Sequence, residues 1–377
     1  MPHKNARSFS PSEFQSRILG WYHDNHRVLP WRETGNNAVT PYAVWLSEIM
    51  LQQTTVPAVI PYFLKFTAAW PDVRALAAAK DEDVMTAWAG LGYYARARNL
   101  LKCARTIVAD WGGEFPQTQE DLLSLPGIGP YTAAAIAAIA FAEGATVVDG
   151  NIERIVARMF AIDTPLPQGK SDIRRAADRI FEGMSRRPAR DIRSYPQALM
   201  DIGAGVCTPT SPACDQCPVA GMCLAKARGN PAQHPVRAPK KAVPTRTGHV
   251  FWIEDQQGYV VFQTRDHDRM LGGMTGLPTT DWDRPDVHPS QNPLETLLDE
   301  CSVLSRTHVG TVRHVFSHFK LVLDVWGIRV EDIRQNIRRD LASVGGIVYN
   351  RYDPAFWDIG VPTVFKKVVL LMKKDVS

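Results

Sequence analysis

The stretch that decides the fold is SLPGIGPYTAAAIAAIA, residues 124–140. Its centre, from Leu125 to Gly129, is a tight turn between two helical patterns, in which Gly127 and Gly129 permit positive φ and close approach of another backbone. Such a turn leaves N–H groups free at a helix start, where they form an anion site that a DNA phosphate fits. The alternative is a helix–helix turn without a ligand. The paired glycines, Pro126 and the alanine-rich helix favour the anion site.

Helical periodicity extends from this stretch in both directions. Near the N-terminus, Ser10, Pro11 and Glu13 mark a helix start with an N-cap, a first-turn proline and a capping box. No convincing strand series precedes Cys207, so roughly the first 225 residues are predicted to be all-α. After the first helix, the others are predicted over residues 42–53, 56–69, 81–88, 95–110, 118–125, 131–142, 152–162, 171–184 and 191–203.

The character of the chain changes after residue 228. Residues 229–246 contain four prolines and several basic residues, which predict an extended linker. This linker is either a solvated spacer or a spacer that also lies near phosphates. Beyond it the apolar period becomes strand-like, and a separate α+β domain is predicted. Its expected strands cover residues 249–255, 258–265 and 320–330, and its expected helices cover residues 293–302 and 333–342.

Length and composition limit the class of protein. The chain has 377 residues, 45% hydrophobic and 22% charged, which is enough apolar material for two or three folded domains. The net charge of +4 permits a nucleic-acid partner without requiring one. Because we find neither a membrane-length apolar run nor a signal-peptide pattern, we expect a reducing, cytoplasmic compartment.

Four of the six cysteines lie close together, at Cys207, Cys214, Cys217 and Cys223, with the spacing C-x6-C-x2-C-x5-C. Four thiolates so arranged suit an iron–sulfur cluster or a structural zinc, and the spacing leaves that choice open. A disulfide framework is the weaker alternative, because such frameworks staple short chains that lack a core. Cys103 lies in an apolar helical pattern and is expected to be a core residue.

Two carboxylates are candidates for acid–base chemistry. Glu48 has apolar neighbours on its predicted helix, and burial among them would raise its pKa toward neutrality, as a general acid needs. The plain alternative is an exposed helix glutamate. Asp149 precedes the helix that begins near Ile152, so it is either an ordinary N-cap or a second carboxylate that faces Glu48 across a cleft.

The segment LGYYARAR, residues 91–98, combines aromatic and apolar side chains with two arginines on a turn. Apolar wedges beside basic residues are what a DNA-kinking protein inserts between bases. The alternative is a core aromatic pair with a solvated basic face.

In combination and in this order, LSEIMLQQT, GLGYYARARNL, LPGIGPYTAAAI, VVDGNIERIVAR and the cysteine loop resemble the endonuclease III-like superfamily of DNA glycosylases. Within it they are most similar to the MutY branch, and the resemblance runs from about residue 14 to the expected final strands. Tyr131 stands where related lyases have a lysine, and a tyrosine cannot form a Schiff base. The segment RHVFSHF, residues 313–319, resembles the Nudix-like domain of that branch.

The resemblance implies a domain plan. It places a helical DNA glycosylase region at residues 1–228, with a six-helix subdomain at about 38–143. A cluster subdomain then comprises residues 10–37 and 144–228. The linker follows at residues 229–246. A Nudix-like domain that recognises 8-oxoguanine occupies residues 247–377.

The resemblance also implies an activity: excision of adenine mispaired with 8-oxoguanine or guanine in duplex DNA, by hydrolysis of the N-glycosidic bond after base flipping. Glu48 matches the acid that protonates adenine, and Asp149 the carboxylate that stabilises the sugar cation. Tyr131 and Asn151 match residues that position them, and Arg32 is expected to line the adenine pocket.

Other matches concern DNA and the cofactor. Gln53, Thr54, Leu91 and Tyr93 match the group that fills the gap in the duplex and contacts the 8-oxoguanine side. Ser317, with Phe316 and His318, matches the loop that distinguishes 8-oxoguanine from guanine. Gly127 and Gly129 are expected to bind a DNA phosphate. The four cysteines match ligands of a [4Fe–4S] cluster. The resemblance implies a monomer in the cytoplasm that acts on nucleoid DNA. One departure is the first cluster loop, residues 208–213, which has no charge where relatives are basic.

Three other functions are kept as alternatives to this reading. The chain could be a glycosylase for mismatched thymine or an oxidised pyrimidine. It could be a cluster protein that only binds DNA. A Nudix hydrolase is the third alternative, and the absence of a glycine-led, glutamate-rich helix argues against it.

Overall fold

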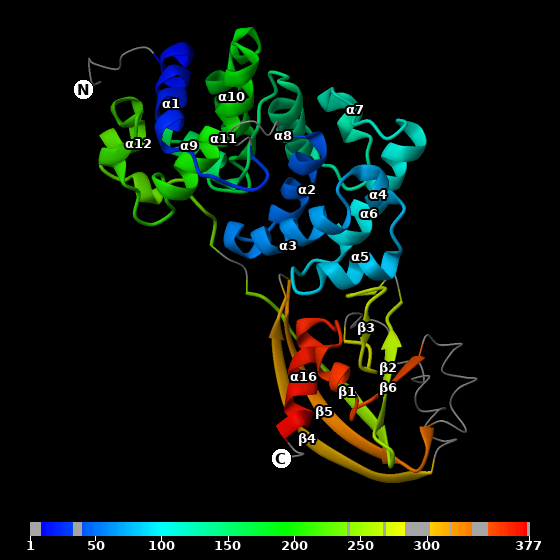
Figure 1. The fold of residues 1–377 in the computed structure, drawn as a ribbon. Coiled ribbons are helices and arrows are strands. Elements are labelled where there is room, and N and C mark those ends of the chain that lie inside the picture. The colour runs from blue at the N-terminus through cyan, green and yellow to red at the C-terminus, as the bar shows by residue number, and fades with distance from the viewer. Residues whose placement is uncertain are drawn as a thin grey trace. The chain divides into compact units, whose positions relative to one another are not determined.

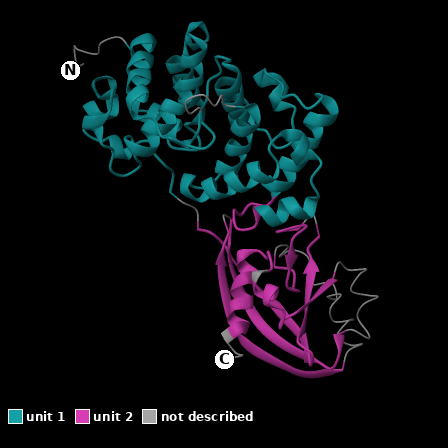
Figure 2. Cartoon of the chain, viewed as in Figure 1, with its two compact units in different colours: residues 1–87, 95–240 teal, residues 88–94, 241–377 magenta. Residues whose placement is uncertain are grey.

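The structure is a computed structural model that describes residues 9–32, 40–239, 242–266, 269–282, 302–316, 318–333 and 346–374. The chain divides into two compact units, residues 1–87 with 95–240 and residues 88–94 with 241–377 (Figure 2). The first unit is helical. The second contains a mixed sheet with a helix packed on it, so the predicted order of an all-α region and an α+β domain is confirmed.

Twelve described α-helices precede the sheet (Figure 1). They are α1 (Pro11–Asn25), α2 (Pro41–Leu51), α3 (Val56–Ala69), α4 (Val73–Ala77), α5 (Asp81–Trp88), α6 (Ala95–Asp110), α7 (Gln119–Leu123), α8 (Pro130–Phe141), α9 (Gly150–Met159), α10 (Lys170–Phe181), α11 (Ala189–Gly205) and α12 (Leu224–Ala227). Short 3₁₀ turns join some of them, at η1 (Met184–Arg186), η2 (Cys214–Gln216), η3 (Ala220–Met222) and η4 (Pro231–Gln233).

Helix boundaries follow local chemistry. Ser10 caps α1 as predicted, because its hydroxyl accepts from the Glu13 N–H at 3.3 Å. The sequence did not predict α4, whose N-cap Asp72 accepts from the Ala75 N–H at 2.8 Å. The helix predicted over residues 171–184 ends at Phe181, shortly before Gly183 takes a left-handed conformation with φ 80°.

Helix α8 forms the centre of the first unit. It is buried from Thr132 to Ala140 and packs against α2, α7 and α11. Alanine at most of these positions lets neighbouring helices approach closely, so α8 brings α2 and α11 near one another although about 140 residues separate them in sequence. That packing positions the candidate site.

The first part of the predicted linker belongs to the helical unit. The Leu166 N–H donates to the Val236 carbonyl at 2.8 Å, and the Ala238 N–H donates to the Leu166 carbonyl at 3.2 Å. His234 is buried. The prediction of an extended, solvated spacer from residue 229 is therefore wrong for residues up to Ala238, because backbone pairing and burial hold this segment in place.

The second unit has a sheet in the order β3-β2-β1-β5-β4, with β6 paired to β2. The β1–β5 pair is parallel and the other pairs are antiparallel. The strands are β1 (Thr245–Asp255), β2 (Tyr259–Thr264), β3 (Thr275–Gly276), β4 (Val303–Val315), β5 (Lys320–Val330) and β6 (Gly346–Asn350). The sequence predicted β1, β2 and β5 but missed β4, whose side chains are mostly exposed.

One sheet face is covered by α16 (Thr363–Lys374), which buries Phe365 and Val368 against Val250 and Leu323. This helix was not among the elements predicted from the sequence. A short 3₁₀ turn, η5 (Pro354–Asp358), precedes this helix. The helices predicted at residues 293–302 and 333–342 lie almost entirely outside the described residues.

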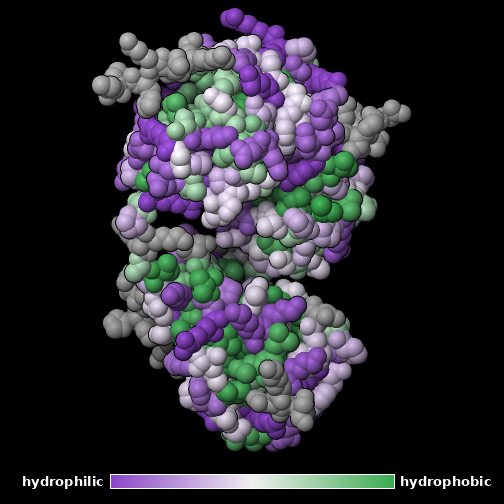
Figure 3. Space-filling model, turned by 90° about the vertical axis from the view of Figure 1, so that its left-hand side faces the viewer, coloured by the Kyte–Doolittle hydropathy of each residue, from purple (hydrophilic) through white to green (hydrophobic). Residues whose placement is uncertain are grey.

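Hydrophilic and hydrophobic residues are interspersed on the face of the two units that Figure 3 shows. Across the described part of the chain, no helix combines the length and the apolar character that a bilayer crossing requires.

Candidate active site

Glu48 is buried on α2, with 7% of its surface exposed. The Tyr131 hydroxyl, from the first turn of α8, donates a 2.6 Å hydrogen bond to Glu48 Oε2. Burial raises the pKa of Glu48 to about 7, although the Tyr131 hydrogen bond and the Arg32 charge oppose the rise. The carboxyl can therefore give up and regain a proton near neutral pH. This burial rules out the exposed-glutamate alternative.

Tyr131 itself stays a phenol. Burial and the nearby carboxylates raise its pKa well above the usual value. It is therefore a hydrogen-bond donor to Glu48 throughout the physiological range.

Asp149 lies at the N-terminus of α9 and is both an N-cap and a half-buried carboxyl. Its Oδ1 accepts from the Ile152 N–H at 2.7 Å, and its Oδ2 accepts from Asn151 Nδ2 at 2.8 Å. Burial raises the pKa of Asp149, while these hydrogen bonds act to lower it. The charge of Asp149 also raises the pKa of Glu48, so the two carboxyls are close enough to interact. The two alternatives from the sequence are thus compatible.

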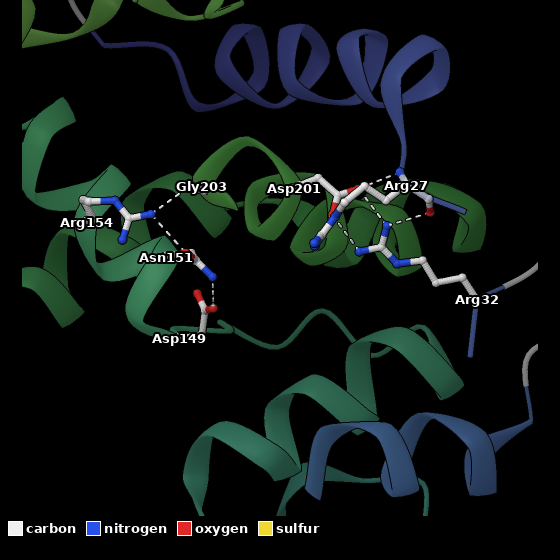
Figure 4. Close-up of polar contacts among 7 residues, drawn as sticks. All are labelled: Arg27, Arg32, Asp149, Asn151, Arg154, Asp201 and Gly203. Carbon is white, nitrogen blue, oxygen red and sulfur yellow. Dashed lines mark hydrogen bonds and ion pairs between the residues drawn. The ribbon is translucent and has the colours of Figure 1, made fainter. Parts of the chain in front are cut away.

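Asn151 connects Asp149 to the residues behind it (Figure 4). Its Oδ1 accepts from Arg154 Nη2 at 3.0 Å, and the same nitrogen donates to the Gly203 carbonyl at 2.6 Å. Arg154 Nε donates to the Cys207 carbonyl at 2.7 Å. A continuous hydrogen-bond path therefore joins Asp149 to the backbone of the first cysteine of the loop.

Arg32 is held by a buried carboxylate. Its Nη1 and Nη2 donate to Asp201 Oδ2 and Oδ1 at 2.7 and 2.9 Å (Figure 4). Arg27 binds the same carboxylate through its backbone N–H and its Nε, at 3.0 and 2.6 Å. Burial acts to raise the pKa of Asp201, but these two arginines hold it below its ordinary value. A permanent charge on Asp201 thus fixes both guanidinium groups.

A pocket lies against Glu48. Its lining combines apolar side chains with several polar groups, as in many sites for small organic ligands. The sequence identified Glu48 and Arg32 but missed Gln197, Met200 and the supporting Asp201, which follow one another on α11 at helical spacing. The lining residues are Arg27, Leu29, Trp31, Arg32, Val44, Ser47, Glu48, Leu51, Val56, Ile139, Gln197 and Met200.

The four cysteines line one pocket together with apolar side chains that include Ile155, Met159 and Val219. Burial raises the pKa of the Cys217 thiol to about 11, so a positively charged group is needed to keep thiolates there. Within the described residues, no three His, Cys, Asp or Glu side chains are placed to hold one metal ion. Four thiols that line one pocket are the donor set that an iron–sulfur cluster takes.

Arg158 supports this cysteine pocket. Its Nη1 donates to Cys207 Sγ at 3.2 Å and to the Thr208 carbonyl at 2.7 Å, and its Nη2 donates to the Pro209 carbonyl at 2.7 Å. Hydrogen bonds from a buried arginine stabilise a thiolate ligand and fix the uncharged loop of residues 208–213. When a cluster is bound, four iron–thiolate bonds cross-link residues 207–223.

The hairpin turn has the predicted positive φ at Gly127 but not at Gly129, whose φ is −95° and whose added Cβ would have nothing within 4 Å. Gly127 has φ 76°, and a Cβ at this position would lie 2.7 Å from Asn99 Cβ. Gly129 is the N-cap of α8, and no side chain caps that helix. The first N–H groups of α8 are thus left without a side-chain cap, as an anion site requires.

The turn after α2 is fixed from α6. Arg96 Nη1 donates to the carbonyls of Ile49, Met50 and Gln52, and its Nη2 donates to Thr54 Oγ1 at 3.2 Å. Gln53, in this turn, has φ 58°. Arg96 therefore caps a helix, and the prediction that it forms part of a basic surface is wrong.

Leu91 is buried, whereas Tyr93 is 49% exposed and has φ 48°. Phe316 and His318 lie in the second unit, at the turn between β4 and β5, and Ser317 lies outside the described residues. Among the predicted site residues, the structure groups Glu48, Tyr131, Asp149, Asn151 and Arg32 in the first unit.

Family models match the two units. The model for the HhH-GPD superfamily of base excision DNA repair proteins matches residues 46–182, and the NUDIX domain model matches residues 249–371. The iron–sulfur binding domain of endonuclease III matches residues 207–223, which agrees with the thiol pocket and decides for a [4Fe–4S] cluster.

Whole-chain relatives give a more specific match. The adenine DNA glycosylase of Homo sapiens is 34% identical over 84% of this chain and 67% of its own length. That of Buchnera aphidicola subsp. Acyrthosiphon pisum is 31% identical over 96% of this chain and 98% of its own length. Among solved structures, that of a thermostable thymine-DNA glycosylase matches this chain with 28% sequence identity and a TM-score of 0.50. The match covers 58% of this chain and 97% of the glycosylase.

Proposed function

This chain belongs to the adenine DNA glycosylases, within the HhH-GPD superfamily of base excision DNA repair proteins, and we propose that it excises adenine opposite 8-oxoguanine or guanine by hydrolysing the N-glycosidic bond without cutting the strand. The observation that carries the proposal is the buried Glu48 carboxyl, hydrogen-bonded to Tyr131 and within electrostatic reach of Asp149. The adenine must leave the base stack to reach this carboxyl.

Glu48 acts first as a general acid. With a pKa of about 7, a useful fraction of the carboxyl is protonated at neutral pH. It gives its proton to N7 of the flipped adenine, the C1′–N9 bond breaks, and the bonding electrons leave with the base. The resulting carboxylate then takes a proton from the water that attacks C1′.

Asp149 stabilises the positive charge that develops on the sugar. It accepts hydrogen bonds from Asn151 and from the N-terminus of α9, both of which favour the ionised form. Two carboxyls in different surroundings thus divide the work of proton donor and charge stabiliser. Tyr131 orients Glu48, and because it has no amine it supports hydrolysis without a Schiff-base lyase step.

The pocket of Arg32, Gln197 and apolar neighbours receives the adenine. The fixed guanidinium of Arg32 and the amide of Gln197 offer hydrogen bonds to ring nitrogens, and the apolar walls accept the flat faces. The uncapped N-terminus of α8, at Gly127 and Gly129, binds a phosphate of the same strand.

The partner base is read by other residues. We assign Gln53, Thr54, Leu91 and Tyr93 to the gap left in the duplex. Phe316, Ser317 and His318 are assigned to recognition of 8-oxoguanine. The NUDIX-like unit then recognises a lesion rather than hydrolysing a diphosphate. We also propose that the enzyme works as a monomer and in a reducing cytoplasm, which suits a thiolate-held cluster.

Single-turnover excision on five duplexes tests the proposal. Adenine is placed opposite 8-oxoguanine, guanine or thymine, thymine opposite guanine, and thymine glycol opposite adenine. We expect base release from the first two duplexes, fastest with 8-oxoguanine, and no strand cleavage before alkali treatment. Release of mismatched thymine or thymine glycol at a comparable rate would overturn the proposal in favour of another base.

A further inference from the structure

We propose that an aromatic clamp, formed by His314, Phe316, Phe319 and Trp282, fixes the turn between β4 and β5 at Phe316 and Phe319, and that Trp282 thereby sets the preference for 8-oxoguanine over guanine opposite adenine. The inference rests on the proposed function. It adds Trp282 as a positioning residue, which acts through Phe316 and not by contact with the lesion.

The clamp encloses a tight turn. The Phe316 N–H donates to the Phe319 carbonyl at 2.9 Å, which closes a four-residue turn between β4 and β5. His318 lies between these two residues. Phe316 and Phe319 flank the tip, and their ring centroids are 4.8 Å apart. The direction of the tip therefore depends on how these two rings are held.

Trp282 contacts both rings. It stacks on Phe316 with a centroid distance of 5.7 Å and an interplanar angle of 18°, and it lies 6.1 Å from the Phe319 ring. On Phe316 the His314 ring packs edge to face at 4.6 Å. Burial, with the charge of Lys367 nearby, lowers the pKa of His314, so its ring is neutral at pH 7 and packs as an aromatic. Phe316 thus has aromatic partners both within its own strand and outside it.

Trp282 is itself firmly anchored. It is 1% exposed, and its Nε1 donates to Thr279 Oγ1 at 3.1 Å. The buried Arg265 donates to the same oxygen at 3.0 Å and places its guanidinium carbon 4.9 Å from the Trp282 ring. Arg265 Nε also donates to the Met270 carbonyl at 2.8 Å. Because Trp282 is held by these contacts, it restricts the motion of the Phe316 ring that stacks on it.

Further contacts hold the base of the turn. The Arg246 guanidinium carbon lies 4.3 Å from the Phe319 ring. Lys367, from α16, donates to the Arg313 carbonyl at 2.7 Å near the end of β4. The clamp therefore ties the turn to β1, to α16 and to the segment after β2, which restricts its motion from several directions.

Rigidity at this turn affects selectivity for a physical reason. 8-Oxoguanine and guanine differ by one oxygen and one N–H, so their discrimination depends on a few hydrogen bonds placed within fractions of an ångström. A mobile turn loses conformational entropy when it forms hydrogen bonds to the base. This loss weakens binding most in the complex with 8-oxoguanine, which makes the most of those bonds. The clamp contains no group from the Glu48 pocket, so its loss should leave bond breaking intact.

The test compares Trp282→Leu with Trp252→Phe in the full-length, cluster-containing protein. Trp252 is an equally buried tryptophan of the same core, and its Nε1 bonds Glu254, which is not part of the clamp. Single-turnover rates are measured with adenine opposite 8-oxoguanine and opposite guanine. We expect Trp282→Leu to lower the ratio of the two rates about tenfold, mostly through the 8-oxoguanine substrate. Trp252→Phe should keep the wild-type ratio.

Hydrogen–deuterium exchange provides a readout that does not depend on activity. In the DNA-free protein, the Phe316 amide should exchange faster in Trp282→Leu than in wild type or Trp252→Phe, since its bond to Phe319 opens more often. Trp282→Phe keeps an aromatic ring and serves where the leucine variant fails to fold. It should lower the rate ratio by less, about two- to fourfold.

The outcomes separate the two claims. If the wild-type protein shows no preference for 8-oxoguanine, the proposed lesion specificity is overturned, and so is the role of the clamp in that specificity. A wild-type preference that survives in Trp282→Leu or, failing that, in Trp282→Phe overturns the clamp alone. An equal loss of preference in Trp252→Phe also overturns it, because the effect would then be general destabilisation of the core.

Discussion

The carboxyls near the end of α2 and at the start of α9 both have a pKa raised by burial, but they differ in the hydrogen bonds that oppose the rise. Glu48 accepts a single side-chain hydrogen bond, from Tyr131, and burial among apolar side chains dominates its pKa. Asp149 accepts from a backbone N–H and an amide at the N-terminus of a helix, all of which favour its charge. Because more neighbours favour the charged form at Asp149 than at Glu48, the comparison indicates how two similar groups can divide the roles of anion and proton donor.

The largest expected effect is that of Glu48→Gln, which removes the proton donor but keeps the shape. Excision from the adenine:8-oxoguanine duplex should slow by about 10³- to 10⁴-fold in single turnover, as expected for loss of a general acid. Glu13→Gln, on the exposed surface of α1, is the matched control and should be neutral. A loss of less than tenfold would place the catalytic proton elsewhere.

Asp149→Asn sharpens the comparison, because asparagine is also a good N-cap. Helix α9 should stay intact while the charge is lost, and single-turnover excision should slow by about 10²- to 10³-fold, in the range of lost electrostatic stabilisation. Asp72→Asn makes the same change at the N-cap of α4 and should leave the rate unchanged. Similar excision rates for wild type and Asp149→Asn would mean that Asp149 acts only as the N-cap of α9 and not in catalysis.

Cys217→Ser tests whether the cysteine pocket belongs to the chemistry or to the fold. If the cluster cross-link is worth as much as a native disulfide, roughly 2–5 kcal/mol, the Tm falls by about 4–20 °C. Iron content and DNA affinity should fall with it. Cys103→Ser, at a buried cysteine outside the pocket, should retain its iron. A metal-free variant that is stable and binds DNA normally would contradict this assignment.

The pH dependence of excision tests the Glu48 pKa. The rate should fall as pH rises through about 7, because the protonated acid is lost. Tyr131→Phe removes a hydrogen bond that lowers this pKa, so the alkaline limb should shift upward by about 0.4–1 unit. A downward shift would mean that Tyr131 stabilises the protonated acid instead.

The raised pKa of Glu48 should also make the stability of the folded protein depend on pH. Burial raises the pKa of Glu48 in the folded protein above its ordinary value of 4.5, so the folded state is favoured while this carboxyl is protonated and loses that advantage as pH rises from about 4.5 through 7. Glu48→Gln should therefore melt at a higher temperature than wild type at pH 8 and at about the same temperature at pH 4. Catalysis by a buried acid thus costs stability at alkaline pH.

Local signals predicted much of the helical unit. Caps, prolines and glycines located the start of α1 and the turn before α8, since these act within a few residues. No prediction was made for α16, although its buried residues Val364, Phe365, Val368, Val369 and Met372 follow a helical period. The sequence also failed at β4, because an exposed edge strand has no apolar alternation to reveal it.

The pocket was harder to predict than the catalytic pair. Glu48 and Asp149 lie in recognisable motifs, whereas Gln197 and Asp201 lie on an otherwise ordinary amphipathic helix and reach the site only because α11 packs on α8. Arg96 is the reverse case. Its sequence neighbours indicated a basic surface, but its position beside the end of α2 makes it a cap for backbone carbonyls.

By itself the sequence determined the class of this protein: a hairpin turn for phosphate, four cysteines for a metal centre, and two carboxyls at recognisable places. The tertiary structure decided what those groups can do. A pKa depends on desolvation and on charges contributed by distant segments, so only the packing of α2, α8 and α11 could show that Glu48 is buried. Likewise, only the folded second unit shows Trp282 stacked on Phe316, since the rings meet across 34 residues of sequence.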